Sequence, residues 1–193
     1  GCYVNPISVA VSDSPDGQYE YLGQVKDKGG QPLMTYVCFD PGLMNDDGVI
    51  RLYYGASFEF DEHRRFGNNW IFNLIEAKMF KRSVKTIKNT PGGVMGAFMV
   101  ELEDDMLTAK TAPIRLLNNL VKGTSFEGHG FFEASSMRKI GDTYYFIYSS
   151  RNNHELCYAT SQYPNRDFVF RGTIVSNGDI GFEGRQAENR TNA

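Results

Sequence analysis

The sequence predicts an all-β fold assembled from propeller blades, and three observations support this prediction. Short runs of β-branched and aromatic residues recur along the chain and are separated by Gly, Pro, Asn and Asp. Turns that contain Asp and Gly join two pairs of these runs, at residues 45–48 and 140–142. Two stretches of the chain also repeat without a gap. Because fixed repeats of short strands are typical of propellers, we expect blades of four antiparallel strands.

The strands are expected in pairs joined by recognisable turns. Residues 12–17 combine Ser, Asp, Pro and Gly and form the first turn, and residues 34–39 lead through 40–44 into the turn at 45–48. In that turn we interpret Asp46 and Asp47 as turn formers rather than as a metal-binding or catalytic pair. The expected strands cover residues 7–11, 19–22, 49–55, 98–102, 114–117, 131–137 and 143–148.

The repeats define the expected blade-like units. Residues 8–23 align with 157–172, and residues 40–48 align with 133–141. Each unit is expected to contain an innermost strand, a tyrosine-rich second strand, a strand of the Ala-x-Ser type and an outer strand. The whole chain then forms one partial propeller domain, residues 1–193, with units at about 1–25, 30–120 and 125–175.

The stretch near residues 70–88 interrupts the strand pattern. Its apolar residues Ile71, Leu74, Ile75, Met79 and Phe80 have helical spacing, and the pattern ends before Pro91. We interpret it as a short amphipathic helix inserted between blade strands, packed through its apolar side. The alternative, a basic membrane-surface helix, is less favoured, because one moderately apolar face is common to any packed surface helix.

Charge and cysteine usage exclude several classes of partner. The chain has 20 Lys and Arg against 23 Asp and Glu, a formal net charge of −3, and no basic stripe that would neutralise nucleic acid. Cys2, Cys38 and Cys157 form no C-x-x-C pair, and the three histidines lack metal-ligand spacing, so we expect no disulfide framework and no metal site.

Neither a membrane span nor a leader is visible in the numbered chain. No stretch approaches the roughly 18 consecutive apolar residues of a membrane helix, and the first residues lack the features of a signal peptide. A soluble chain of unknown localisation is predicted. It starts without Met close to a strand-like run, which suggests a fragment.

Three segments, in this order and spacing, resemble glycoside hydrolase family 43. They are residues 8–17, residues 39–41 with 45–48, and residues 133–136 with Gly141 and the tyrosines at 144–145. The resemblance implies a five-bladed propeller, of which about three blades are present here. It also implies inverting hydrolysis of arabinosyl or xylosyl linkages in plant polysaccharides or oligosaccharides.

The resemblance also implies roles for individual residues. Glu133 matches the general acid, and Asp40 matches the carboxylate that orients the acid and modulates its pKa. The general base would lie on an inner strand before residue 7, and no residue here matches it. The fragment alone is therefore expected to have lost most of its catalytic activity, because it lacks the general base.

Four further residues are candidate contacts to an oligosaccharide substrate: His129, Phe39, Ser135 and His154. For the two histidines, a simple loop role with bonds to backbone is the alternative. The family resemblance calls for no cofactor, although the complete propeller leaves room for a central ion. A non-catalytic carbohydrate-binding propeller is the competing function, and a related five-bladed hydrolase or phosphorylase is the third.

Overall fold

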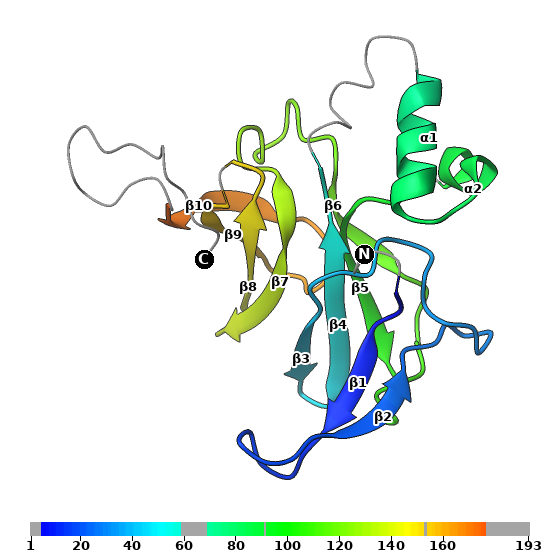
Figure 1. Ribbon diagram of the computed structural model, residues 1–193. Helices are drawn as coiled ribbons and strands as arrows, with labels where there is room; N and C mark the ends of the chain where they lie inside the picture. The colour runs from blue at the N-terminus through cyan, green and yellow to red at the C-terminus, as the bar shows by residue number, and fades with distance from the viewer. Residues whose placement is uncertain (1–4, 59–68, 91, 153, 177–193) are drawn as a thin grey trace.

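The computed structural model describes residues 5–58, 69–90, 92–152 and 154–176, and within them the chain is mostly β-strand (Figure 1). The strands are β1 (Ser8–Val11), β2 (Glu20–Gln24), β3 (Gly42–Asp46), β4 (Val49–Ala56), β5 (Gly96–Leu102), β6 (Ile114–Asn118), β7 (Phe131–Ile140), β8 (Thr143–Ser150), β9 (Leu156–Ser161) and β10 (Val169–Val175). The helices are α1 (Asn69–Met79) and α2 (Val84–Asn89).

The strands form three antiparallel sheets. One sheet has the order β3-β4-β5-β6 and another has the order β10-β9-β8-β7, so each is a four-stranded meander in chain order. This is the geometry of a propeller blade, and the predicted all-β fold is confirmed. The third sheet contains only β1 and β2 among the described residues. By the sequence repeat, β1 and β2 correspond to β9 and β10, the two outer strands of a blade.

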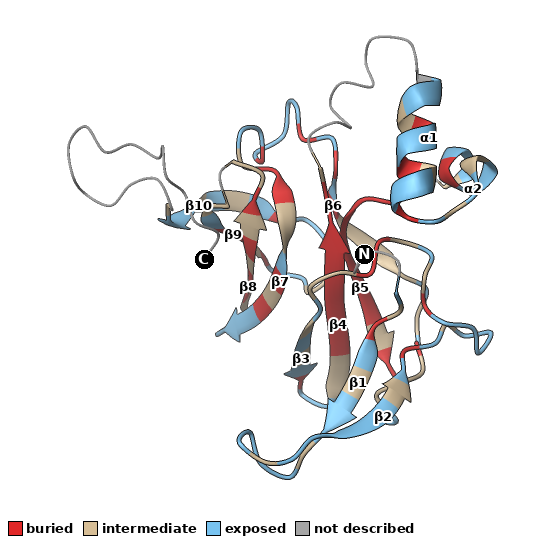
Figure 2. Cartoon of the chain, in the orientation of Figure 1, coloured by how far each residue is buried: buried red, intermediate tan, exposed pale blue. Residues whose placement is uncertain are grey.

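The central sheet, β3 to β6, has a buried core on each face. Side chains alternate along β4, because successive residues of a strand point to opposite faces. Tyr53 packs in the cluster shared with the β7–β10 sheet, whereas Leu52 and Tyr54 pack in the cluster shared with the segments around β1 and β2. Figure 2 shows the consequence: β4 and β5 are buried along most of their length, while β1 and β2 are largely exposed.

The inserted segment forms two helices instead of the single one predicted. Lys81 has φ 48°, which breaks the helical path after α1. The Ser83 side chain then accepts a hydrogen bond from the Thr86 backbone N–H at 3.0 Å and caps the start of α2. None of the described helices is long and apolar enough to cross a membrane.

Of the apolar residues that were expected to pack, Phe80 does so, but most of the others do not, and for these the expectation was wrong. Ile71, Leu74 and Ile75 are each more than 40% exposed. The buried positions are Asn73, Glu76 and the following Phe80, which recur at helical spacing. Phe80 anchors this side in a core cluster of residues from the surrounding loops and strands, and its position decides which helix face turns inward.

Candidate functional site

The starts of β3 and β7 lie against each other, and this contact brings the two predicted carboxyl residues into one region. Asp40 comes two residues before β3, and Glu133 is the third residue of β7. A Cβ atom on Gly42 would overlap the backbone carbonyl oxygen of Ser135. Only glycine therefore allows the two backbones to approach this closely.

The backbone is strained around both carboxyl residues. Asp40 has φ 41° and Ala134 has φ 62°, in the left-handed region that residues with a Cβ rarely adopt. The register of β7 against β8 shifts on both sides of Glu133, so this residue lies between two irregularities of the kind that re-aim side chains. The Ala134 N–H donates a hydrogen bond to the Asp40 carboxyl group. Strain of this kind clusters at functional sites.

Glu133 and Asp40 interact electrostatically. Burial disfavours the charged form of Glu133, the negative charge of Asp40 acts in the same direction, and the pKa of Glu133 rises to about 7. Burial also raises the pKa of Asp40, against the opposing effect of the hydrogen bond from Ala134. Near neutral pH, a large share of Glu133 is therefore protonated beside a second carboxyl group.

Aromatic rings pack beside this region. The Phe132 ring meets the Phe58 ring edge-on, with centroids 5.7 Å apart, and the His154 ring at 4.8 Å. The Ser57 N–H donates to the Phe132 carbonyl oxygen at 2.8 Å and joins the end of β4 to β7. His154 thus lies against the residue next to Glu133, and its contact to a sugar stays a prediction.

Phe39 and Ser135 have structural surroundings that the sequence did not indicate. Phe39 is partly buried and packs against the core cluster of the helical insertion, and its carbonyl accepts the Gly55 N–H at 2.9 Å. Ser135 is 5% exposed, and its hydroxyl has no hydrogen-bond partner within the described part of the chain. Their roles as substrate contacts stay predictions.

His129 contacts the outer strands of its blade. Its Nδ1 lies 3.2 Å from Glu155 Oε2, and its ring stacks on Phe170 of β10 with a centroid distance of 4.5 Å. The Tyr148 hydroxyl donates to its carbonyl oxygen at 2.7 Å and holds the loop. The predicted contact of His129 to substrate therefore has no support from these partners.

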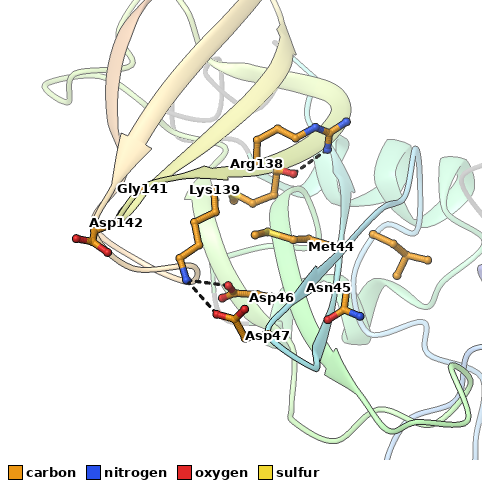
Figure 3. A pocket seen from close by; sticks show the side chains of 10 residues that line it. Met44, Asn45, Asp46, Asp47, Arg138, Lys139, Gly141 and Asp142 are labelled. Carbon is orange, nitrogen blue, oxygen red and sulfur yellow. Dashed lines mark hydrogen bonds and ion pairs between the residues drawn. The ribbon is translucent and has the colours of Figure 1, made fainter.

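A hollow of about 550 Å³ lies at the other ends of the same strands, between the two hairpin turns (Figure 3). It does not include Asp40 or Glu133. Its lining consists of Leu43, Met44, Asn45, Asp46, Asp47, Met137, Arg138, Lys139, Gly141 and Asp142.

Asp46 holds the two blades together at this hollow and is not a turn residue, so that part of the interpretation was wrong. Its Oδ2 accepts hydrogen bonds from Arg51 Nη1 and the Tyr144 hydroxyl, both at 2.6 Å. Its Oδ1 accepts a hydrogen bond from Lys139 Nζ at 2.9 Å. Burial alone would raise the pKa of Asp46, but the Tyr144 and Lys139 hydrogen bonds and the Arg51 charge hold it below its ordinary value. Asp47, with φ 51°, occupies the turn itself.

Comparison with known proteins identifies similar sequences and structures. A xylosidase/arabinosidase of Thermoclostridium stercorarium is 37% identical over 180 residues, which cover 90% of this chain and 32% of the relative. A xylosidase/arabinosidase of Bacteroides ovatus is 27% identical over 175 residues, which cover 88% of this chain and 48% of the relative. The crystal structure of a GH43 beta-xylosidase/alpha-arabinofuranosidase from a compost microbial metagenome, in complex with xylotriose, matches with a TM-score of 0.57. That match has 26% identity and covers 89% of this chain and 49% of the other. Over about nine tenths of its length, the chain is therefore similar to xylosidases/arabinosidases and to a solved structure of glycoside hydrolase family 43.

The family 43 match covers most of this chain but only part of its relatives. The chain spans about a third to a half of the length of the two curated relatives. No family model matches it. The two four-stranded sheets and the β1–β2 hairpin have the strand order of complete or partial propeller blades.

Proposed function

We propose that the protein hydrolyses xylosyl or arabinosyl linkages of oligosaccharides or polysaccharides with inversion of configuration. The observation that carries the proposal is the pair formed by Glu133 and Asp40, in which a half-buried glutamate with a pKa of about 7 lies close to a second carboxyl group on a strained backbone. Two relatives are named xylosidase/arabinosidase, which supports the choice of sugars.

In this mechanism Glu133 is the general acid. A glutamate with its ordinary pKa of 4.5 would be ionised near neutral pH and could not donate a proton. Burial and the charge of Asp40 keep the proton on Glu133, which transfers it to the departing glycosidic oxygen. The Ala134 N–H holds the Asp40 carboxyl in position, so we assign to Asp40 the positioning and tuning of the acid.

An inverting reaction also needs a carboxylate that activates water on the opposite face of the sugar ring, about 6.5–9.5 Å from the acid. We assign no residue of this chain to that role. The relatives are two to three times as long as the segment matched here, so the water-activating group is to be sought in the whole protein.

The acid role is tested on the whole protein, which includes the water-activating group, with aryl xylosides and arabinofuranosides whose leaving groups differ in pKa. For Glu133→Gln we expect a loss of kcat/KM of about 10²–10⁴-fold with poor leaving groups, because they need a proton. The loss should be much smaller with dinitrophenyl glycosides, which leave as anions. The exposed Glu103 provides the matched control, and Glu103→Gln should retain full activity with every substrate.

Two outcomes would contradict the proposal. Equal losses across all leaving groups would remove Glu133 from the acid role. Sugar binding without turnover, in the wild type and in Glu133→Gln alike, would favour the carbohydrate-binding alternative. Product stereochemistry, followed by NMR, separates the third interpretation, because retention excludes an inverting mechanism.

A further inference from the structure

A cluster of three potential metal ligands lies at the end of the β7–β10 sheet where β7 and β9 begin, and it takes no part in the proposed hydrolysis. His129 comes from the loop before β7, Glu155 directly precedes β9, and Cys157 lies in β9. One ligand atom of each residue lies within 4.8 Å of the other two. The three groups come together through the pairing of strands and not through sequence spacing.

The distances fit a small tetrahedral ion. Zinc binds nitrogen and oxygen ligands at about 2.0–2.2 Å, so two such ligands at the tetrahedral angle lie roughly 3.3 Å apart. The observed distance from His129 Nδ1 to Glu155 Oε2 is 3.2 Å. The Cys157 sulfur lies within 4.8 Å of both atoms. If this sulfur moved about 1 Å toward them, all three atoms could bind one zinc ion, with the sulfur at the usual zinc–sulfur distance of about 2.3 Å.

The donor set favours one class of metal. Calcium and magnesium prefer oxygen ligands, whereas a thiolate and an imidazole favour zinc and similar ions. One carboxylate and one thiolate would cancel the charge of a divalent ion in this mostly buried place. The Glu155 side chain is 13% exposed and the His129 side chain is 33% exposed, so a metal ion can reach the ligands from solvent.

The surroundings already orient these ligands. The hydroxyl of Thr173 on β10 lies 3.5 Å from the Cys157 sulfur. The same hydroxyl donates a hydrogen bond to Glu155 Oε2 at 3.4 Å. The stacking of the His129 ring on Phe170 and the bond from Tyr148 to the His129 carbonyl fix the histidine. Such outer contacts hold ligands in place for a metal.

We propose that His129 Nδ1, Glu155 Oε2 and Cys157 Sγ form a zinc site with three protein ligands and water in the fourth position. On binding, the Cys157 thiol releases its proton to solvent and the thiolate forms the zinc–sulfur bond, while His129 binds through its unprotonated nitrogen. The ion joins the loop before β7 to β9 and steadies the strand that carries Glu133.

The test uses cobalt(II) as a spectroscopic probe on purified protein freed of metal with a chelator. Wild type should show the near-ultraviolet band of thiolate-to-cobalt charge transfer together with the visible bands of tetrahedral cobalt, and zinc should displace the cobalt. Cys157→Ser should lose the charge-transfer band. Cys38 is buried in a different core cluster, and Cys38→Ser should keep it.

The partly exposed His129 provides the second variant. His129→Ala should weaken cobalt and zinc binding at least about tenfold, because even the loss of an outer contact has that effect. If Cys157→Ser does not fold, this variant decides the question. The proposal is overturned if wild type shows no charge-transfer band, if the band survives in folded Cys157→Ser, or if His129→Ala binds cobalt with unchanged affinity. None of these outcomes depends on the glycosidase assay.

Discussion

At the scale of single residues, the environment of Glu133 is the feature with the clearest chemical consequence. The folded protein retains a proton on this side chain up to a pKa of about 7, against an ordinary value of 4.5. Between these two values the folded state binds more protons than the unfolded state. The contribution of Glu133 to stability is therefore fully present below pH 4.5 and is lost as the pH rises to about 7.

We predict that Glu133→Gln abolishes the loss of stability that wild type shows as the pH rises. The stability of Glu133→Gln relative to wild type should increase from pH 4.5 to pH 7 and then remain constant. Urea unfolding at a series of pH values measures the difference. Asp40→Asn should lower the upper limit of this pH range and leave the lower limit unchanged, because it removes the like charge that helps to raise the pKa of Glu133 but leaves the burial. A difference that does not change with pH would show that Glu133 titrates normally in the folded protein.

At the scale of elements, the contact between the two blades at the hairpin ends depends on Asp46. Its carboxylate connects β3 with β4, β7 and β8 through Arg51, Lys139 and Tyr144. The Arg51 side chain is only 10% exposed, and its other carboxylate partner, Glu101, lies 3.3 Å from Nε. Loss of the Asp46 charge therefore leaves the poorly solvated Arg51 with one weaker ion pair. Because the pKa of Asp46 is lowered, this stabilisation is present above pH 3.8 and is lost as the pH falls through the lowered pKa.

For Asp46→Asn we predict a loss of about 2 kcal/mol or more in the free energy of unfolding at pH 7. Its neighbour Asp47 is the matched control, since its side chain is 95% exposed and lies 3.7 Å from Lys139. Asp47→Asn should change stability by less than about 0.5 kcal/mol. Denaturant unfolding of both variants measures the effect, and equal losses would refute the special role of Asp46.

At the scale of the whole molecule, apolar side chains are exposed on the β1–β2 hairpin. Tyr19 and Tyr21 are 57% and 68% exposed, and Val11 and Leu22 add to the same two-stranded sheet. Figure 2 shows this sheet at the periphery of the described fold. Exposed apolar residues on a strand with an open edge favour pairing with another chain.

We predict that the 193-residue chain self-associates through this hairpin. Tyr21→Lys should shift the association to higher protein concentration, because the charge opposes burial of the strand. Leu120→Lys, at a position 48% exposed in a loop, is the control and should leave association unchanged. Sedimentation velocity over a range of concentrations measures the effect. A monomeric wild type, or equal effects of the two substitutions, would refute the prediction.

The strands, their turns and the family could be inferred from the sequence because they depend on local or repeated patterns. Alternation and turn residues act over a few positions, and the repeats revealed the blade order. Asp40 and Glu133 were found through the resemblance to glycoside hydrolase family 43, and their matching places in two repeats supported the choice. Nothing local marks Ala134, since an alanine with positive φ looks like any other alanine in a sequence. The exposed side of α1 was missed because helical periodicity does not say which face meets the rest of the protein.

The sequence by itself determined the all-β character, the hairpins and the choice of the two carboxyl residues. Only the tertiary structure decided that Glu133 is half-buried beside Asp40, that Asp46 joins two blades, and that His129, Glu155 and Cys157 share one cluster. The physical reason is that burial and charge interactions depend on distance in space, and residues from different strands become neighbours only when the sheets pair and pack.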